Sequence, residues 1–371
     1  MRIQPKNILL IKLCCLGDII FLTPTIRALR SGYPAAKITL LASSWVEELI
    51  PCIPFVDDFI RFDAPFSGSR LEKIGETLAL LAKARRMKFE LIVLGHRNKF
   101  FGILTRMMKP RMSVGFREAG FLTESIIFDE SAHEVDRYLK FLRILGLSAN
   151  GIETELRPVD SDVQFVYELH QEHGIFPKNL IFGIFPGGGE NPGSSMTIKR
   201  WPPEQFVRLV DSLTERYSCA VVLAGSKGEH ELNESIRERI QNKERVFNYA
   251  GETNLRQFVA LAKSFTVFVG GDSGPTHVAA AVGTPTVSIF GPSDPRLVAP
   301  RGQLHRYVWK QIECSPCYTP RTVVSKRYFR GNEFYCHTGT HACLKTLELE
   351  EVQKAIFDVI EGSKTAETST S

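Results

Sequence analysis

The sequence lacks any apolar run long enough to cross a bilayer. Its best candidate, residues 8–22, is short and contains Lys12 and Asp18. The same stretch has no clear cleavage site and carries an acidic residue inside it, so it does not resemble a signal peptide. We therefore expect a cytoplasmic protein. In that compartment the eight cysteines are expected to be thiols, not a disulfide framework.

The chain also lacks a large excess of either positive or negative charge. The chain has 46 Lys+Arg against 41 Asp+Glu, a formal net charge of +5, which is too mild to imply a nucleic-acid partner. The patterns G-x-G-x-x-G and G-x-x-x-x-G-K-[ST] do not occur, which argues against NAD-type oxidoreductases and P-loop NTPases. G-x-S-x-G and H-E-x-x-H are absent as well.

What the chain does contain is a repeated alternation of short apolar strands and amphipathic helices. This pattern predicts an α/β fold with parallel sheets. Strands are expected at 7–13, 37–42 and 90–94, and again at 180–185, 219–224, 266–269 and 286–290. The alternation stops near Gly146 and restarts near Leu180. The length of 371 residues also suggests more than one domain. We predict two domains facing a cleft, at 1–160 and 175–345, then a helix at 346–362 and a disordered tail at 363–371.

The first strand-to-helix turn contains Leu16–Gly17–Asp18. A carboxylate at the carboxyl end of a strand in a doubly wound sheet stands where ligands bind, so Asp18 is a candidate general base. The other interpretation is a helix N-cap, which satisfies free amides and favours the charged carboxylate. Capping would lower the pKa of Asp18 and weaken it as a base.

Two more glycine-rich turns follow strands in the second half. Gly187, Gly188 and Gly189 precede Lys199 and a helix at 203, a combination of backbone amides and cations that suits a diphosphate. The alternative is a flexible loop with solvated cations. The next turn, GGDSGPTH, offers the amides and hydroxyls of Ser273, Gly274 and Thr276 to an anion. His277 lies in the first helical turn, either at the ligand or as a packed histidine.

Basic residues are concentrated between Lys83 and Arg117, where ten lysines and arginines face one acid, Glu90. Apolar residues interleave with them, among them Phe100, Phe101, Met107, Met108 and Met112. Such a surface suits an anionic amphiphile or a membrane face, and a solvated helix face with core-directed Phe and Met is the alternative. Nucleic acid is disfavoured because no recognised binding motif accompanies the charge.

The C-terminal cysteines have the spacing C-x2-C-x18-C-x6-C, formed by Cys314, Cys317, Cys336 and Cys343. Only the first pair has metal-ligand spacing. A structural zinc or cluster is therefore the second choice, and thiols in a loop-rich segment the first. We predict no metal and no cofactor.

Four segments in order resemble glycosyltransferase family 9, the ADP-heptose:lipopolysaccharide heptosyltransferases. They are ILLIKLCCLGDIIFLTPTIRALR, HEVDRYLKFLRILG, KRWPPEQF and GGDSGPTHVAAAVGTPTVSIFGPSDP, and the similarity extends over about residues 6–360. The resemblance implies a GT-B architecture of two Rossmann-like domains and an inverting, metal-independent transferase. The pair Cys14–Cys15 stands where the family commonly has Ser-Ser.

Carried over residue by residue, the resemblance makes Asp18 the base for the acceptor hydroxyl and Lys199 a donor-phosphate ligand. It places the donor diphosphate at Asp272, Ser273, Gly274 and His277, and the donor nucleoside at Glu229. We add Arg97 and Lys99 as expected acceptor contacts.

The predicted partners are a nucleotide-sugar donor and an anionic lipid-linked saccharide acceptor, with peripheral contact at the inner membrane and no nucleic acid. Three alternatives stay open. They are a transferase for another nucleotide sugar, a sugar-nucleotide epimerase or hydrolase, and a non-catalytic sugar-nucleotide-binding protein.

Overall fold

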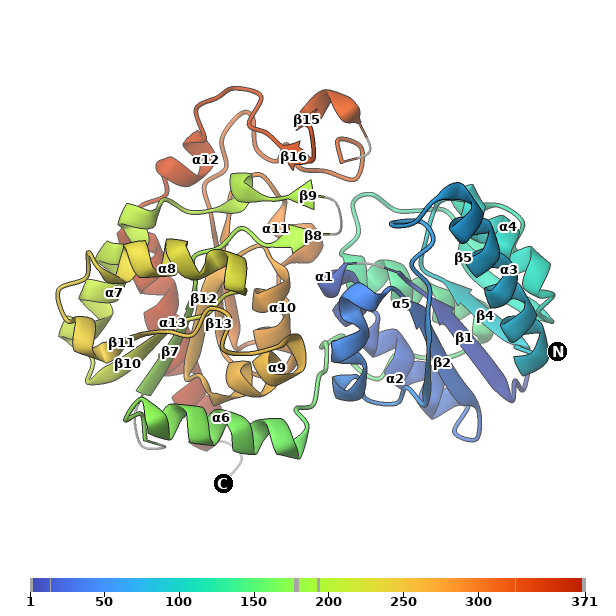
Figure 1. Ribbon diagram of the computed structural model, residues 1–371, viewed down its shortest axis with the longest axis horizontal. Helices are drawn as coiled ribbons and strands as arrows, with labels where there is room; N and C mark the ends of the chain where they lie inside the picture. Colours follow the sequence, from blue (N-terminus) through green and yellow to red (C-terminus); the bar gives the residue numbers. More distant parts are fainter. Residues whose placement is uncertain (1–2, 14, 177–179, 192–193, 324, 369–371) are drawn as a thin grey trace. The chain divides into compact units, whose positions relative to one another are not determined.

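A computed structural model describes residues 3–13, 15–176, 180–191, 194–323 and 325–368. The chain forms two compact units, Met1–Glu155 and Leu156–Ser371 (Figure 1). Most of the residues between the two predicted domains belong to α6 (Asp160–Glu172), which lies in the second unit. Helix α6 packs on α9 (Leu255–Ser264), where Arg256 Nε lies 2.8 Å from Asp162 Oδ2.

The first unit contains a six-stranded, all-parallel sheet in the order β3-β2-β1-β4-β5-β6. Its strands are β1 (Asn7–Ile11), β2 (Lys37–Ala42), β3 (Asp58–Arg61), β4 (Leu91–Leu94), β5 (Met112–Phe116) and β6 (Glu124–Ile126). Its α-helices are α1 (Leu16–Phe21), α2 (Thr23–Gly32), α3 (Arg70–Met87), α4 (Lys99–Met108) and α5 (Glu134–Leu145). The order reverses between β1 and β4, and such a reversal is where ligands bind in open α/β sheets.

The segment after β1 forms two helices, α1 and α2. Leu22 separates them, and Pro24 occupies the second position of α2, where its missing amide costs no hydrogen bond. Asp18 is therefore the third residue of α1 and not its N-cap. The N-cap is Cys15, because the helix begins at Leu16.

The second unit repeats the same topology. Its six-stranded parallel sheet has the order β11-β10-β7-β12-β13-β14, with the reversal between β7 and β12. The strands are β7 (Leu180–Phe185), β10 (Cys219–Leu223), β11 (Val246–Asn248), β12 (Val267–Gly271), β13 (Thr286–Phe290) and β14 (His305–Trp309). The helices besides α6 and α9 are α7 (Pro203–Arg216), α8 (His230–Arg237), α10 (Gly274–Ala281), α11 (Pro295–Val298), α12 (Ala342–Lys345) and α13 (Leu349–Thr368).

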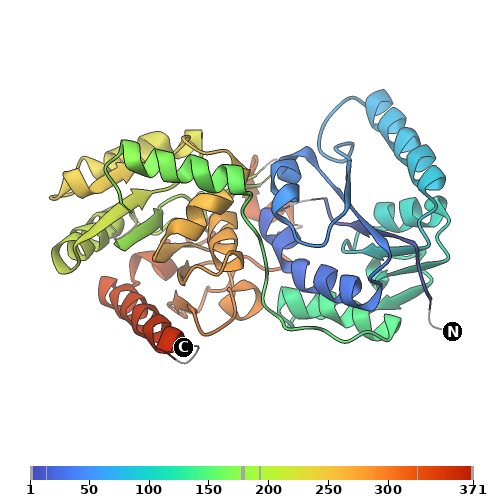
Figure 2. The ribbon, with the colours of Figure 1, turned by 90° about the horizontal axis from the view of Figure 1, so that it is seen from below.

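The C-terminal helix completes the core of the second unit. Val352, Ile356 and Val359 of α13 are buried against the sheet, and Figure 2 shows α13 (red) and α6 (green) on opposite sides of that sheet. The helix extends to Thr368, so the tail expected to be disordered from 363 continues the helix for six more residues.

A small third sheet lies in the second unit, in the order β15-β16-β9-β8. It joins two short hairpins, β8 (Glu190–Asn191) with β9 (Ser194–Ser195) and β15 (Phe329–Arg330) with β16 (Glu333–Phe334). Sequence patterns did not predict this sheet. Within the described part of the chain, no helix combines the length and hydropathy that a membrane span needs.

Candidate active site

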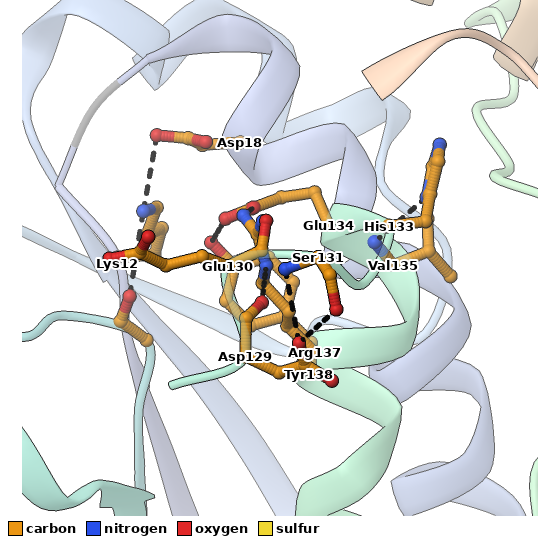
Figure 3. Close-up of polar contacts among 11 residues, drawn as sticks. Lys12, Asp18, Asp129, Glu130, Ser131, His133, Glu134, Val135, Arg137 and Tyr138 are labelled. Carbon is orange, nitrogen blue, oxygen red and sulfur yellow. Dashed lines mark hydrogen bonds and ion pairs between the residues drawn. The ribbon is translucent and has the colours of Figure 1, made fainter. Parts of the chain in front are cut away.

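Asp18 lies just beyond the end of β1, at the reversal of the first sheet. Its carboxylate makes an ion pair with Lys12, with Nζ 3.1 Å from Oδ2 (Figure 3). It also accepts the backbone N–H of Cys15 at 3.3 Å. The capping interpretation is thus correct for the carboxylate's hydrogen bond, although Asp18 is not the cap residue. The ion pair is an additional contact that helix capping does not require, so the cap does not account for the whole site.

Lys12 is a buried cation surrounded by hydrogen-bonding and anionic groups. Its Nζ lies 3.5 Å from the carbonyl oxygen of Gly95, at the end of β4, and 5.7 Å from the centre of the Tyr138 ring. Burial alone would lower the pKa of Lys12, but the Asp18 carboxylate, the Tyr138 hydroxyl and the Glu134 carboxylate raise that pKa well above its usual value. Lys12 therefore stays protonated, and Asp18 has a permanent positive neighbour.

Helix α5 supplies the opposite wall of this site. The Glu134 carboxylate accepts the Tyr138 hydroxyl at 3.0 Å and pairs with the buried guanidinium of Arg137. Arg137 also donates to the carbonyl oxygens of Asp129 at 2.7 Å and Glu130 at 2.9 Å (Figure 3). These bonds fix the start of α5 to the loop before it, so the polar wall beside Lys12 is rigid.

The loop after β4 brings a histidine and an arginine to the same end of the sheet. His96 Nε2 accepts the backbone N–H of Leu13 at 2.8 Å, and burial and the Lys12 charge lower the pKa of His96 well below its usual value. Arg97 is half-buried with its guanidinium 4.0 Å from the centre of the Phe128 ring. Lys99 is exposed at the first turn of α4.

The predicted donor residues of the second unit come together at the reversal of its own sheet. Lys199 Nζ lies 2.6 Å from Asp272 Oδ2, and His277 Nε2 lies 3.6 Å from Asp272 Oδ1. All three side chains are nearly buried. Burial alone would raise the pKa of the Asp272 carboxyl, but the Lys199 ammonium and the His277 imidazole hold it well below its usual range.

The glycine loop after β7 lies against Glu229 and Ser273. A side chain at Gly187 would collide with Glu229, because its Cβ would lie 1.8 Å from Oε1. Gly189 has a φ of +76°, and a Cβ there would lie 3.3 Å from the Cβ of Ser273. Gly188 is equally confined, with a Cβ 2.2 Å from the carbonyl oxygen of Met196. These glycines are therefore required for a close backbone approach and are not a generic flexible loop.

Ser273 and Gly274 begin α10 directly beside this loop. Ser273 is the N-cap and Gly274 the first helical residue, and Pro275 follows. The Thr276 hydroxyl donates to the carbonyl oxygen of Gly271 at 2.7 Å, which fixes the turn. The first amides of a helix have no partner within the helix, so they form an anion-binding end beside the Lys199 ammonium.

This chain is similar to a known protein family and to individual relatives of that family. The model of glycosyltransferase family 9 (heptosyltransferase) matches residues 99–327, more than half of the chain. This chain belongs to glycosyltransferase family 9. It is 28% identical over 317 residues to the lipopolysaccharide heptosyltransferase 2 of Escherichia coli K12, covering 81% of this chain and 87% of that protein.

Solved structures share the fold of this family 9 glycosyltransferase. A glycosyl transferase family 9 protein from Veillonella parvula superimposes with a TM-score of 0.80 at 21% identity, covering 96% of this chain and 97% of that one. The E. coli ADP-heptose lps heptosyltransferase II superimposes with a TM-score of 0.73 at 21% identity, covering 96% and 99%. The architecture is therefore the GT-B-like α/β fold, with two six-stranded parallel sheets.

The cysteines of this family 9 chain are thiols where the structure describes them. Cys14 lies outside the described residues, and the other seven form no disulfide within the described part of the chain. Burial, together with the neighbouring cysteines of the C-terminal group, raises the pKa of Cys317 and of Cys343 to about 11. Among the described residues, no group of three or more Cys, His, Asp or Glu side chains has an arrangement that would hold a metal ion.

Sequence reasoning missed the residues that surround the candidate base. Lys12 belongs to the K-x-x-x-L-G-D segment, and Glu134 and Tyr138 belong to HEVDRY, so all three were inside segments that carried the family resemblance. Their pattern contained the signal, but no spacing rule connects residues 12 and 138. His96 had no signal in the sequence.

Proposed function

We propose that this glycosyltransferase transfers a heptose from ADP-heptose to a lipopolysaccharide core acceptor, with inversion at the anomeric carbon. The observation that carries the proposal is the Lys199–Asp272–His277 group beside the glycine loop and the start of α10. The names of the relatives support this choice of sugar and acceptor, since the E. coli proteins are called ADP-heptose and lipopolysaccharide heptosyltransferases.

In the proposed reaction each unit contributes a different part. The Asp18 carboxylate accepts the proton of an acceptor hydroxyl, and the acceptor oxygen forms a bond to the anomeric carbon from the face opposite the diphosphate. The bond between that carbon and the diphosphate oxygen breaks, and ADP leaves with its electron pair. The Lys199 ammonium and the amides at the start of α10 stabilise the developing negative charge, a role that needs no divalent cation.

Glu229 is proposed to contact the nucleoside of the donor. It is buried, its carboxylate accepts the backbone N–H of Ser226 at 2.8 Å, and it lies against Gly187 of the phosphate loop. A carboxylate held so close to the glycine loop is in reach of the ribose hydroxyls of a nucleotide whose phosphates bind that loop.

The transfer assay tests the proposal directly. We expect the protein to move heptose from ADP-heptose to deep-core lipopolysaccharide, with activity unchanged by EDTA and with the product of inverted anomeric configuration. The readout is mass spectrometry and NMR of the product. Transfer only from UDP- or dTDP-sugars would refute the heptose donor, and donor turnover without an acceptor would favour the epimerase or hydrolase alternative.

The basic segment between Lys83 and Arg117 is proposed to face the acceptor and the inner membrane. Nine of its ten basic residues are exposed and Arg97 is half-buried, while Phe101 and Met108 belong to the core. Two neighbouring helices present exposed apolar residues at the same i, i+3, i+7 spacing, namely Leu71, Ile74 and Leu78 on α3 and Phe100, Ile103 and Met107 on α4. Apolar stripes beside exposed lysines and arginines suit an anionic bilayer surface.

A vesicle-binding experiment tests this surface. In L71Q/I74Q/L78Q we expect at least tenfold weaker sedimentation with vesicles containing anionic phosphatidylglycerol, because three apolar side chains no longer enter the interface. V163Q, at an exposed apolar position of α6, is the matched control and should bind like the wild type. Equal binding by the triple variant, or equal binding of the wild type to neutral vesicles, would count against the proposed membrane face.

A further inference from the structure

The cysteine-containing segment between β14 and α12, residues 310–341, packs on the residues just before Lys199 in its own unit. Its strand β16 pairs with β9, with Glu333 opposite Ser195, and the Glu333 carboxylate accepts the hydroxyl of Thr197. Phe334 is completely buried and packs against Met196 and Ile198. The residues immediately before Lys199 are thus held by this segment and not by the main sheet alone.

Tyr318 is the part of the segment that reaches Lys199. Its backbone N–H donates to the carbonyl oxygen of Pro292 at 2.8 Å, which ties it to the loop after β13. Its ring stands edge-on to Phe334, with the centroids 5.0 Å apart. The backbone hydrogen bond and the ring contact together fix the position of the Tyr318 ring. Lys199 Nζ lies over this ring, 4.3 Å from its centre.

Lys199 therefore has two neighbours of different kinds. Asp272 is an anion and neutralises the ammonium, while the Tyr318 ring attracts a cation through its π-face and carries no charge of its own. An incoming diphosphate is repelled by Asp272 but not by the ring. A neutral aromatic wall thus keeps the ammonium in place and leaves its charge available to the phosphate.

We infer that Tyr318 is a positioning residue for the donor diphosphate, and that the segment 310–341 serves to fix Tyr318 and the loop before Lys199. This inference rests on the proposed function, because it assigns Lys199 to the donor. It gives the segment 310–341 a part in donor binding that does not depend on the cysteines of this segment.

Calorimetric titration with ADP tests the inference. For Y318L we expect about 3- to 30-fold weaker ADP binding, the range that loss of a cation–π contact predicts, and a rise in the donor KM larger than the fall in kcat. Y318F keeps the ring and should restore most of the lost affinity. In the background K199M, where no ammonium faces the ring, Y318L should cause no further loss.

Y335L is the matched control, because Tyr335 lies in the same segment and its ring holds a different cation, Arg330, at 4.4 Å. It should bind ADP like the wild type, and thermal melting checks that all variants are folded. Equal ADP affinity of Y318L and wild type, or equal losses in Y318L and Y335L, would overturn the inference. Failure of the wild type itself to bind ADP would instead overturn the proposed donor.

Discussion

Replacing Asp18 by Asn is expected to lower kcat for heptose transfer by about 10²- to 10⁴-fold, the usual contribution of a general base. The amide has nearly the same size and its oxygen can still accept the N–H of Cys15, but it cannot take the proton of an acceptor hydroxyl. ADP binding should be unchanged, because every predicted donor residue lies in the second unit. Initial transfer rates and ADP titration together measure the two effects.

Glu72 offers a matched control for the helix cap. It is the third residue of α3, as Asp18 is of α1, and its carboxylate accepts the backbone N–H of the N-cap Ser69 at 2.6 Å. E72Q removes the same kind of capping charge where no ion pair with a buried lysine exists, so transfer should be unaffected. A D18N enzyme with transfer within a few-fold of wild type would mean that Asp18 serves the helix and Lys12 only.

The bounds of three strands could be located from the sequence because these strands are buried on both faces. β2, β7 and β13 have the predicted bounds, since a nearly continuous apolar run marks a central parallel strand. Among the strands that were not predicted, β3 and β6 are short and carry charged residues, as in Asp58–Arg61 and Glu124–Ile126. They form the two edges of the first sheet, where such residues are tolerated.

The residues of the candidate site could be predicted from the sequence, but the contacts between them could not. Lys199 and Asp272 were each assigned to the donor, yet they are 73 positions apart, and only the pairing of β7 with β12 explains why they meet at 2.6 Å. The contact of Tyr318 with Lys199 was out of reach for the same reason. It depends on two-residue strands, which are too short to leave a periodic pattern.

Replacing Lys199 by Met is expected to weaken ADP binding by about 10- to 100-fold, the loss that follows from removing one charge-assisted hydrogen bond of 1.5–3 kcal/mol. The variant should also be less stable. It leaves the buried Asp272 without its cation at 2.6 Å, and removing one partner of a buried ion pair costs about 3–5 kcal/mol. ADP titration and thermal melting report the two losses separately.

The loss of stability should depend on pH in a defined direction. In the wild type the pKa of Asp272 is held below its unfolded value, so its stabilising contribution is present above that value and is lost as the pH falls further. Without Lys199, burial becomes the main influence and raises the pKa of Asp272. Folded K199M is therefore destabilised at neutral pH and regains stability as the pH falls and Asp272 becomes protonated. The difference in melting temperature between wild type and K199M should thus be larger at pH 8 than at pH 5.

A double variant separates the structural from the functional part of this lysine. K199M/D272N has no buried charge left unpaired, so it should recover most of the stability that K199M loses and should lose the pH dependence. It should not recover ADP affinity, because the amide supplies no positive charge to the diphosphate. If D272N failed to restore stability, the ion pair would not be the source of the loss. If it restored ADP binding, Lys199 would act only by neutralising Asp272 and not by holding the phosphate.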